Sequence, residues 1–221
     1  MSQTHRMFSD RQDAGRVLAG ILTPYKTQDV VVLALPRGGI PVGREIATAL
    51  SLPLEVLVVR KLGVPGHEEY AMGAIASGGE VVVDDDIVRT MEITPEQLRD
   101  VTAREWRELA RRERMYLTHH GTEIKDKTVI LVDDGIATGA TMRVALLTIR
   151  RASPARVVAA VPVAPRSAFR RFGSLVDDFV VASCPPRFQA VGDAYQDFHQ
   201  ISDEEVRALL SPPAIRGSGD R

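Results

Sequence analysis

The sequence predicts an α/β protein whose core is a doubly wound, mostly parallel β-sheet. Short unbroken apolar blocks recur along the chain, and the clearest is Val30–Leu35, which reads VVVLAL. These blocks lack the apolar/polar alternation of a strand with one solvated face, so we expect strands that are covered on both faces. Helical patterns separate several of the blocks, and such alternation is typical of parallel sheets. Aromatic residues make up only 5% of the chain, so Val, Ile, Leu and Ala must build the core.

The apolar blocks and the segments between them give the expected elements in chain order. Strands are expected at Val30–Leu35, Leu54–Val59, Val81–Val83, Thr128–Val132, Arg156–Val161 and Leu175–Val181. A helix over Ile40–Leu50 carries Pro41 in its first turn, where a missing N–H costs nothing. A second helix over Thr141–Arg151 places Val144 and Leu147 on one apolar stripe.

Two further helix-forming segments lie outside this alternation. Near the N-terminus, Ser9 and Gln12 have the spacing of a capping box, and Phe8 stands where a hydrophobic staple would pack. The segment Thr94–His120 predicts a long helix that is rich in arginine. It is either a solvated helix with ion pairs such as Glu108–Arg112, or an arm that packs on another subunit or reaches a phosphate.

Composition excludes several classes of protein. The 221 residues carry 28 Lys and Arg against 29 Asp and Glu, a net charge of -1, so no global field draws the chain to nucleic acid or membrane. The single cysteine, Cys184, excludes an internal disulfide and a Cys-cluster metal site. No apolar leader follows the N-terminus. We therefore expect a soluble cytoplasmic protein with one domain over residues 1–210 and a disordered tail at 211–221.

The most informative segment is Val129–Met142, which reads VILVDDGIATGATM. An apolar strand runs into Asp133 and Asp134, and the small residues that follow lead into a helix. Such a loop at a helix N-terminus lets several backbone N–H groups converge on an anion, aided by the helix dipole. Two adjacent carboxylates are poor phosphate ligands, but they suit the vicinal hydroxyls of a ribose and can hold Mg²⁺ through water. The segment therefore predicts a site for a sugar that carries a phosphate.

Other acidic pairs and other phosphate motifs fit this chemistry less well. Val81–Asp86 reads VVVDDD but no glycine follows it, and Asp177-Asp178 has no loop of small residues behind it. We interpret both as solvated strand ends. A P-loop requires Gly-Lys-Ser/Thr, whereas Ala140 follows Gly139, and no G-x-G-x-x-G run occurs.

The Val129–Met142 segment resembles the motif with which type I phosphoribosyltransferases bind PRPP (5-phosphoribosyl 1-pyrophosphate), an apolar strand followed by V-D-D-x-x-x-T-G-x-T. The resemblance covers about residues 8–210, and it is closest to a group of uncharacterised bacterial phosphoribosyltransferases. It implies that family's fold, with a small hood at 8–25 and 183–210 and a helical insertion at 94–120. Asp133 and Asp134 would hold the ribose hydroxyls and, through water, Mg²⁺. The residues implied to bind PRPP are Asp133, Asp134, Gly135, Ile136, Ala137, Thr138, Gly139, Ala140 and Thr141.

Two segments match the family's pyrophosphate loop and flexible catalytic loop. Leu35–Gly39 (LPRGG) stands where the family has a pyrophosphate loop, often with a non-proline cis peptide, although an ordinary tight turn fits as well. Leu62–Gly78 is similar to the flexible catalytic loop of adenine phosphoribosyltransferases, and a plain surface hairpin is the alternative. The residues implied to bind pyrophosphate are Arg37, Gly38, Gly39, Arg60 and Lys61. Those implied to be catalytic are Lys61, Arg37, Asp133 and Asp134.

The acceptor site is the least determined part of the resemblance. The candidates for contact with the base are Phe188, Asp193, Tyr195 and Asp197, and a plain lid-loop role fits them equally. Hypoxanthine-guanine enzymes have an Asp where Ala137 stands, and adenine enzymes have a Glu where this chain has Met72–Ala74. Neither proton carrier is therefore present, and Glu68 or Glu69 could substitute for it.

The resulting hypothesis is Mg²⁺-dependent transfer of the 5-phosphoribosyl group from PRPP to a purine-like nitrogenous base, with release of pyrophosphate, by a homodimer. One alternative is a regulatory protein that senses PRPP or a nucleotide without turnover, and another is a protein that binds a different phosphosugar in the same loop. Nucleic acid is not expected as a partner, because the Arg-rich helix is the only basic candidate surface.

Several reactive residue types are given no chemical role. His67 and His119-His120 lack a second ligand cluster at metal-binding spacing, so no zinc site is expected. Trp106 and Tyr116 are interpreted as packing residues of the long helix. Cys184 has no histidine near it in the sequence, and we do not expect it to act as a nucleophile.

Overall fold

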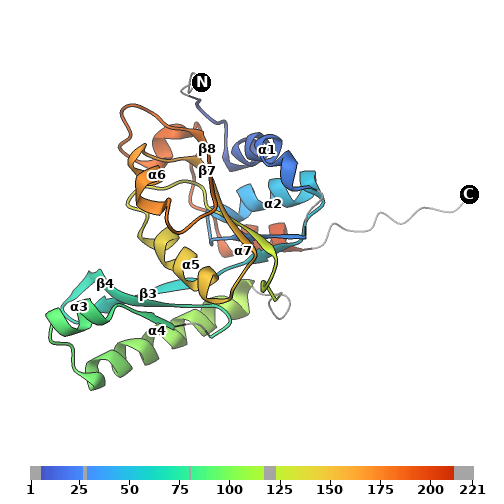
Figure 1. The fold of residues 1–221 in the computed structure, drawn as a ribbon. Coiled ribbons are helices and arrows are strands. Elements are labelled where there is room, and N and C mark those ends of the chain that lie inside the picture. The colour runs from blue at the N-terminus through green and yellow to red at the C-terminus, as the bar shows by residue number, and fades with distance from the viewer. Residues whose placement is uncertain (1–5, 27–28, 80, 117–122, 212–221) are drawn as a thin grey trace, which may run out of the picture.

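A parallel sheet of five strands, in the order β2-β1-β6-β7-β8, forms the centre of the protein (Figure 1). The computed structural model describes residues 6–26, 29–79, 81–116 and 123–211. The strands of this sheet are β1 (Val30–Ala34), β2 (Leu54–Val56), β6 (Thr128–Val132), β7 (Arg156–Val163) and β8 (Asp178–Ser183). All of its neighbouring strands run parallel, which confirms the predicted fold class, an α/β protein with a doubly wound sheet.

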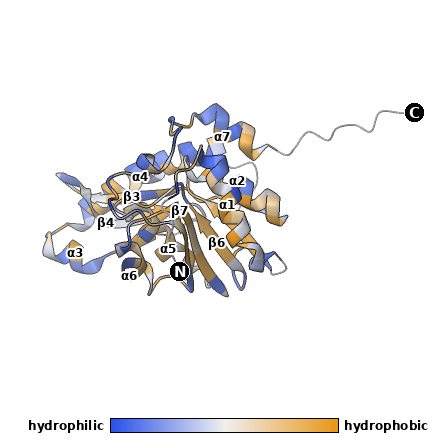
Figure 2. Ribbon diagram, turned by 90° about the horizontal axis from the view of Figure 1, so that it is seen from above, coloured by the Kyte–Doolittle hydropathy of each residue, from blue (hydrophilic) through white to orange (hydrophobic). Residues whose placement is uncertain are grey.

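Helices cover both faces of this sheet. The first face carries α1 (Arg11–Ile21) and α2 (Gly39–Leu50), and the second carries α5 (Ala140–Arg151) and α6 (Ser167–Phe172). Alternate strand residues pack on opposite layers, so Val32 and Ile130 face the first pair of helices while Val31 and Leu131 face the second. After their polar first residues, Thr128 and Arg156, the strands β6 and β7 are apolar, as Figure 2 shows. This double burial is the physical reason for the unbroken apolar blocks in the sequence.

A second, antiparallel sheet of three strands extends to one side of the core, in the order β3-β4-β5 (Figure 1). Its elements are β3 (Val59–Val64), β4 (His67–Ala76) and β5 (Val81–Val83), followed by α3 (Asp85–Thr90) and the long α4 (Pro95–Tyr116). The helix α4 packs its buried Val101 and Leu109 against Leu62 and Ile75 of this sheet. The predicted strand Leu54–Val59 is thus wrong as one element, because the chain leaves the parallel sheet after β2 and enters the hairpin at β3.

The hairpin β3–β4 occupies the segment that resembles a flexible catalytic loop. Its turn lies at Pro65-Gly66, where Gly66 has φ +79, a value that favours glycine. Leu62–Gly78, interpreted either as a flexible catalytic loop or as a surface hairpin, has the shape of a hairpin, since most of it lies in β3 and β4.

The hood brings the N-terminal segment against the chain near its C-terminal end. Phe8 is buried and pairs with Tyr195 in an isolated β-bridge. The remaining short elements are η1 (Thr23–Tyr25), η2 (Val191–Ala194) and α7 (Asp203–Leu210). The predicted cap of the first helix is wrong, because Asp10 rather than Ser9 caps α1 and accepts the Asp13 N–H at 2.7 Å. Phe8 lies in one buried cluster with Ala14 of α1 and with Ala194 and Tyr195 of the hood.

The Arg-rich helix α4 shows the ion pairs of a solvated helix. Glu108 accepts hydrogen bonds from Arg111 at 2.8 Å and Arg112 at 2.9 Å, and these bonds lower the pKa of Glu108 to about 2. Trp106 and Tyr116 pack against the second sheet, as predicted. The end of the predicted helix (117–120), His119-His120 and the tail from residue 212 lie outside the described residues. Within the described chain, no helix combines the length and apolar content needed to cross a bilayer.

Candidate active site

Two loops meet at the carboxyl edge of the parallel sheet. The strands β1 and β6 are neighbours in register, with Ala34 opposite Val132, so the segments that follow them leave the sheet side by side. A Cβ on Gly38 would overlap the Asp134 carboxylate, and a Cβ on Gly39 would lie 2.7 Å from the Val132 carbonyl oxygen. Only glycine at these two positions allows the first loop to approach the second so closely.

The loop after β1 has the features expected of the LPRGG segment. The peptide bond between Pro36 and Arg37 is cis. Gly38 then precedes α2, and the N–H groups of Gly39 and Ile40 at the start of that helix donate to the carbonyl oxygens of Leu35 and Arg37. The Arg37 guanidinium is half-buried, and its Nη1 lies 3.9 Å from Oδ1 of Asp203 in α7. This loop therefore presents one arginine and one helix N-terminus at the sheet edge.

The two adjacent aspartates at the end of β6 have different surroundings. Oδ1 of Asp133 accepts the Asp134 N–H at 2.9 Å, and Oδ2 of Asp134 accepts a hydrogen bond from Nε of Arg11 at 2.8 Å. Burial, and then the charge of Asp134, raise the pKa of Asp133 well above its usual range. Burial also raises the pKa of Asp134, against the opposing effect of Arg11. A ligand that donates hydroxyl hydrogen bonds would stabilise these desolvated carboxylates.

The loop of small residues after Asp134 presents unpaired backbone N–H groups. Among the described residues, no protein acceptor is recorded for the amides of the segment Ala137–Thr141, although Arg171 donates to the carbonyl oxygen of Thr138. Ala137, Thr138 and Thr141 are exposed, so neither burial nor side-chain packing fills the loop. Gly139 has φ +74 and begins α5 without a side-chain cap. The amides thus remain available to an anion at a helix N-terminus.

Comparison with known proteins assigns this arrangement to a family. A family model described as the phosphoribosyl transferase domain matches residues 10–184. The chain belongs to the phosphoribosyltransferase family. A Mycobacterium tuberculosis H37Rv protein named "Putative phosphoribosyl transferase Rv0571c" is 44% identical over 206 residues, which are 93% of this chain and 46% of the relative. The chain thus spans about half the length of the curated relatives it matches.

Two solved structures share the fold of this chain. The crystal structure of TT1426 from Thermus thermophilus has a TM-score of 0.83 and 41% identity, over 92% of this chain and 97% of that one. The AQ2163 protein from Aquifex aeolicus has a TM-score of 0.50 at 13% identity, over 82% of this chain and 78% of that one, which is a likeness of fold alone. The resemblance inferred from the sequence is therefore confirmed: the chain has the type I phosphoribosyltransferase fold and belongs to a family of pentosyl-transferring enzymes.

The two candidate cations Arg60 and Lys61 lie on β3, the first strand of the hairpin. Arg60 donates two hydrogen bonds to a single oxygen of Glu105 in α4, since Nη2 lies 2.6 Å and Nε 2.9 Å from Oε2. Lys61 pairs across the hairpin with Ala74. Arg60 therefore links the second sheet to α4 through this ion pair. The sequence could not indicate the pair, because Glu105 is 45 residues away.

The four candidates for the base site have structural contacts of their own. Tyr195 is buried against Phe8, and its hydroxyl donates to the carbonyl oxygen of Asp134 at 2.6 Å. Phe188 packs partly buried in the same hood cluster. Asp193 accepts the Ala190 N–H at the start of η2, and Asp197 accepts hydrogen bonds from His199. Tyr195 is thus hydrogen-bonded to the segment that carries the two aspartates, whereas Phe188, Asp193 and Asp197 make contacts within the hood.

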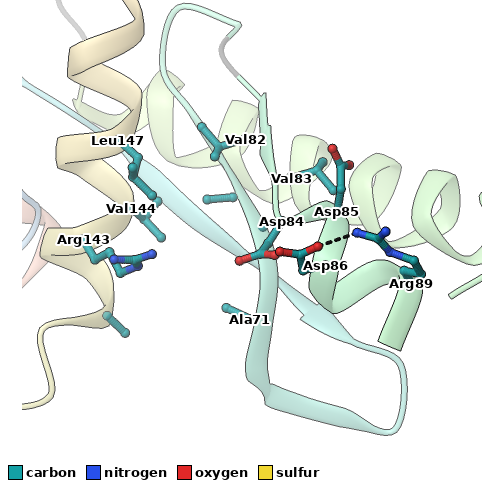
Figure 3. Close-up of a pocket in the computed structure, with 13 residues that line it drawn as sticks. Ala71, Val82, Val83, Asp84, Asp85, Asp86, Arg89, Arg143, Val144 and Leu147 are labelled. Atoms are coloured by element: carbon teal, nitrogen blue, oxygen red, sulfur yellow. Dashed lines mark hydrogen bonds and ion pairs between the residues drawn. The ribbon is translucent and has the colours of Figure 1, made fainter. Parts of the chain in front are cut away.

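Two hollows border the site. The hood hollow, a cavity of about 300 Å³, is lined by Arg11, Arg37, Gly38 and the segment Phe198–Ile201. The hairpin hollow, about 680 Å³, lies between α5 and the second sheet. In Figure 3, Arg143 of α5 stands across it from Asp84 and Asp86, and Asp86 pairs with Arg89. It reaches the small-residue loop at Ala140, so both hollows adjoin the candidate PRPP residues.

The other acidic residues singled out in the sequence lie at strand ends. Asp84 caps α3 by accepting the Ile87 N–H, and Asp85 and Asp86 are exposed, as expected of a solvated strand end. Asp177-Asp178 also lies at a strand end, because Asp177 is exposed and Asp178 begins β8, where it accepts hydrogen bonds from Tyr25 and Arg156. Cys184 is buried, and burial raises the pKa of its thiol, which fits the absence of a nucleophilic role.

Sequence reasoning missed Arg11, the most deeply placed cation of the site. Its guanidinium lies 3.9 Å from the centroid of Phe198 and donates to the carbonyl oxygen of His199. Arg11 and Asp134 are separated by 123 residues, and no local pattern marks a helical arginine as buried. Only the fold brings α1 over the end of β6.

Proposed function

We propose that this phosphoribosyltransferase transfers the 5-phosphoribosyl group of PRPP to a purine-like nitrogenous base and releases pyrophosphate. The observation that carries the proposal is the pairing, at one sheet edge, of unpaired loop amides with the two carboxylates of Asp133 and Asp134. A ligand that satisfies both must carry an anionic group for the amides and hydroxyl groups for the carboxylates. A phosphorylated ribose has both, with the phosphate at one end of the sugar and the hydroxyls at the other.

The proposed chemistry follows from where each group lies. The amides of Ala137–Thr141 would bind the 5-phosphate, and Asp133 and Asp134 would accept hydrogen bonds from the ribose hydroxyls. The bond from C1 of the ribose to a pyrophosphate oxygen breaks, and C1 gains positive character before the base nitrogen bonds to it. Arg37, with Gly38 and Gly39 at the start of α2, would stabilise the departing oxygens, and Lys61 would add a second cation.

We propose Mg²⁺ as the metal, bound mainly by the substrate. The two carboxylates are hard oxygen ligands, but the described residues contain no group of three His, Cys, Asp or Glu side chains that could hold an ion. Mg²⁺ suits such a site because it keeps several waters and takes the rest of its ligands from phosphate oxygens. Asp133 and Asp134 would contact it through water. When bound, it would neutralise charge on the pyrophosphate.

The acceptor base is proposed to lie against the hood. Phe188, Asp193, Tyr195 and Asp197 remain the proposed contacts, with Tyr195 acting through the Asp134 backbone. Ala137 supplies no carboxylate to the loop.

A pyrophosphate-release assay with PRPP, Mg²⁺ and a panel of purines and pyrimidines tests this function. The proposal predicts release with at least one purine-like base and none without PRPP. The missing carboxylate at Ala137 favours one competing function, a regulator that senses PRPP or a nucleotide. Silence with every base, together with saturable PRPP binding, would replace the enzyme with that regulator.

We further propose a cytoplasmic homodimer. The Arg-rich face of α4 is the surface that suggested a second subunit, and Arg104 and Arg107 of this helix are exposed. Light scattering at micromolar concentration should give twice the chain mass, and a monomer mass would refute the dimer.

A further inference from the structure

Arg11 is almost completely buried, although it carries a full positive charge. Its side chain is only 8% exposed, and the Asp134 side chain that it meets is 16% exposed. Nε donates to Asp134 at 2.8 Å and Nη1 donates to the His199 carbonyl oxygen at 2.9 Å. Its guanidinium also lies over the Phe198 ring. These contacts fix the plane of the guanidinium between the sheet edge and the hood.

The third nitrogen of this guanidinium has no recorded protein partner. The hydrogen bonds of Arg11 within the described chain come from Nε and Nη1 and not from Nη2. In the same described residues, no side-chain nitrogen or oxygen that is sealed from solvent lacks a partner, so Nη2 must reach an accessible space. Arg11 lines a hollow of about 340 Å³ with Asp197 and Glu205, and it also lines the hood hollow together with Arg37 and Gly38. That hollow contains the loop to which pyrophosphate is assigned above.

We propose that Arg11 is a further residue of the PRPP site, which orients the Asp134 carboxylate through Nε and binds a pyrophosphate oxygen through Nη2. This inference rests on the proposed function. An arginine suits the two tasks because its planar fork can hold a carboxylate on one side and a phosphate on another, which the single ammonium of a lysine cannot do. Arg11 and Arg37 would then place two positive charges in the hood hollow.

The experiment measures the binding of three ligands by isothermal titration calorimetry in the presence of Mg²⁺. Pyrophosphate probes the hood hollow alone, ribose 5-phosphate probes the loop and carboxylates, and PRPP probes both. Arg11→Met should weaken pyrophosphate about tenfold or more and PRPP further still. Arg16→Met is the matched control, because Arg16 lies on the same helix with only an exposed 3.8 Å pair to Glu45. It should change neither affinity.

Arg11→Lys separates charge from geometry and serves if Arg11→Met does not fold. It should bind pyrophosphate and ribose 5-phosphate with intermediate affinity, because one ammonium cannot occupy both positions. Pyrophosphate affinity equal to that of the wild type in the folded Arg11 variants would overturn the inference, while PRPP binding by the wild type would leave the proposed function intact. Failure of the wild type to bind PRPP would instead refute the proposed function, and this inference with it.

Discussion

Gly38→Ala isolates the close approach of the two loops. The backbone of Gly38 has φ -64 and ψ -31, ordinary helical values that alanine adopts without strain. The added methyl group would nevertheless overlap Oδ2 of Asp134. Since that oxygen accepts the hydrogen bond from Arg11 at 2.8 Å, the carboxylate can move only by breaking this ion pair. The substitution therefore displaces Asp134 without removing it.

The expected loss follows from that broken contact. A hydrogen bond to a charged group contributes about 1.5–3 kcal/mol, and this pair is shielded from water on both sides. If ribose binding needs Asp134 in its present position, PRPP affinity should fall about 10- to 150-fold. The free energy of unfolding should fall by no more than about 3 kcal/mol, because the overlap is confined to one carboxylate.

Calorimetric titration with PRPP and urea unfolding measure the two quantities. Gly20→Ala in α1 is the matched control, because nothing lies within 4 Å of its Cβ position. That control should keep wild-type affinity and gain about 0.5–1 kcal/mol in stability. A folded Gly38→Ala protein that binds PRPP as tightly as the wild type would refute the reasoning.

Three further variants test the electrostatics and the packing of the site. Asp133→Asn should raise the free energy of unfolding, and the gain should be larger at about pH 7 than at pH 5. The pKa of Asp133 is raised in the folded protein, so its ionisation opposes folding increasingly as pH rises. A larger gain at the lower pH would contradict this. Gly139→Ala should cost about 1–2 kcal/mol in urea unfolding, because φ is +74 and its Cβ would lie 2.5 Å from Phe172; unchanged stability would argue against it. Arg60→Met should cost about 1–3 kcal/mol by thermal unfolding, because it removes two hydrogen bonds to the buried Glu105, which then keeps the longer 3.3 Å contact from Nε of Arg104; a melting temperature equal to that of the wild type would exclude the role of this pair.

The core and the loop after β6 could be predicted because their causes are local in the sequence. A strand buried on both faces must be apolar at every position, and Thr128–Val132 is observed with the bounds that its block predicts. A loop that binds an anion needs small residues before a helix. Glycine is required most strongly at position 139, where φ is +74 and a Cβ would lie 2.5 Å from Phe172. Neither inference depends on knowing which distant segment packs nearby.

The errors and omissions arise where distant or competing contacts decide the outcome. Ser9 and Asp10 both fit as caps of α1, and only the extended backbone of Asp10 identifies the one used. The sequence makes Tyr195 a candidate for contact with the base, yet Tyr195 is buried against Phe8 and its hydroxyl donates to the carbonyl oxygen of Asp134. Arg11 is marked by no pattern at all. Tyr195 and Arg11 contact a residue from a distant part of the chain, Asp134, and Ser9 and Asp10 are adjacent residues that are both suited to cap the helix.

The double variant Asp133→Asn, Asp134→Asn tests the central claim most directly. It removes both charges with little change in volume, so circular dichroism should report an intact fold. Titrated with PRPP in the presence of Mg²⁺, it should show no saturable binding, because the ribose hydroxyls lose the two carboxylates that accept their hydrogen bonds. Wild-type affinity for PRPP in this variant would contradict the assignment of the sheet-edge site.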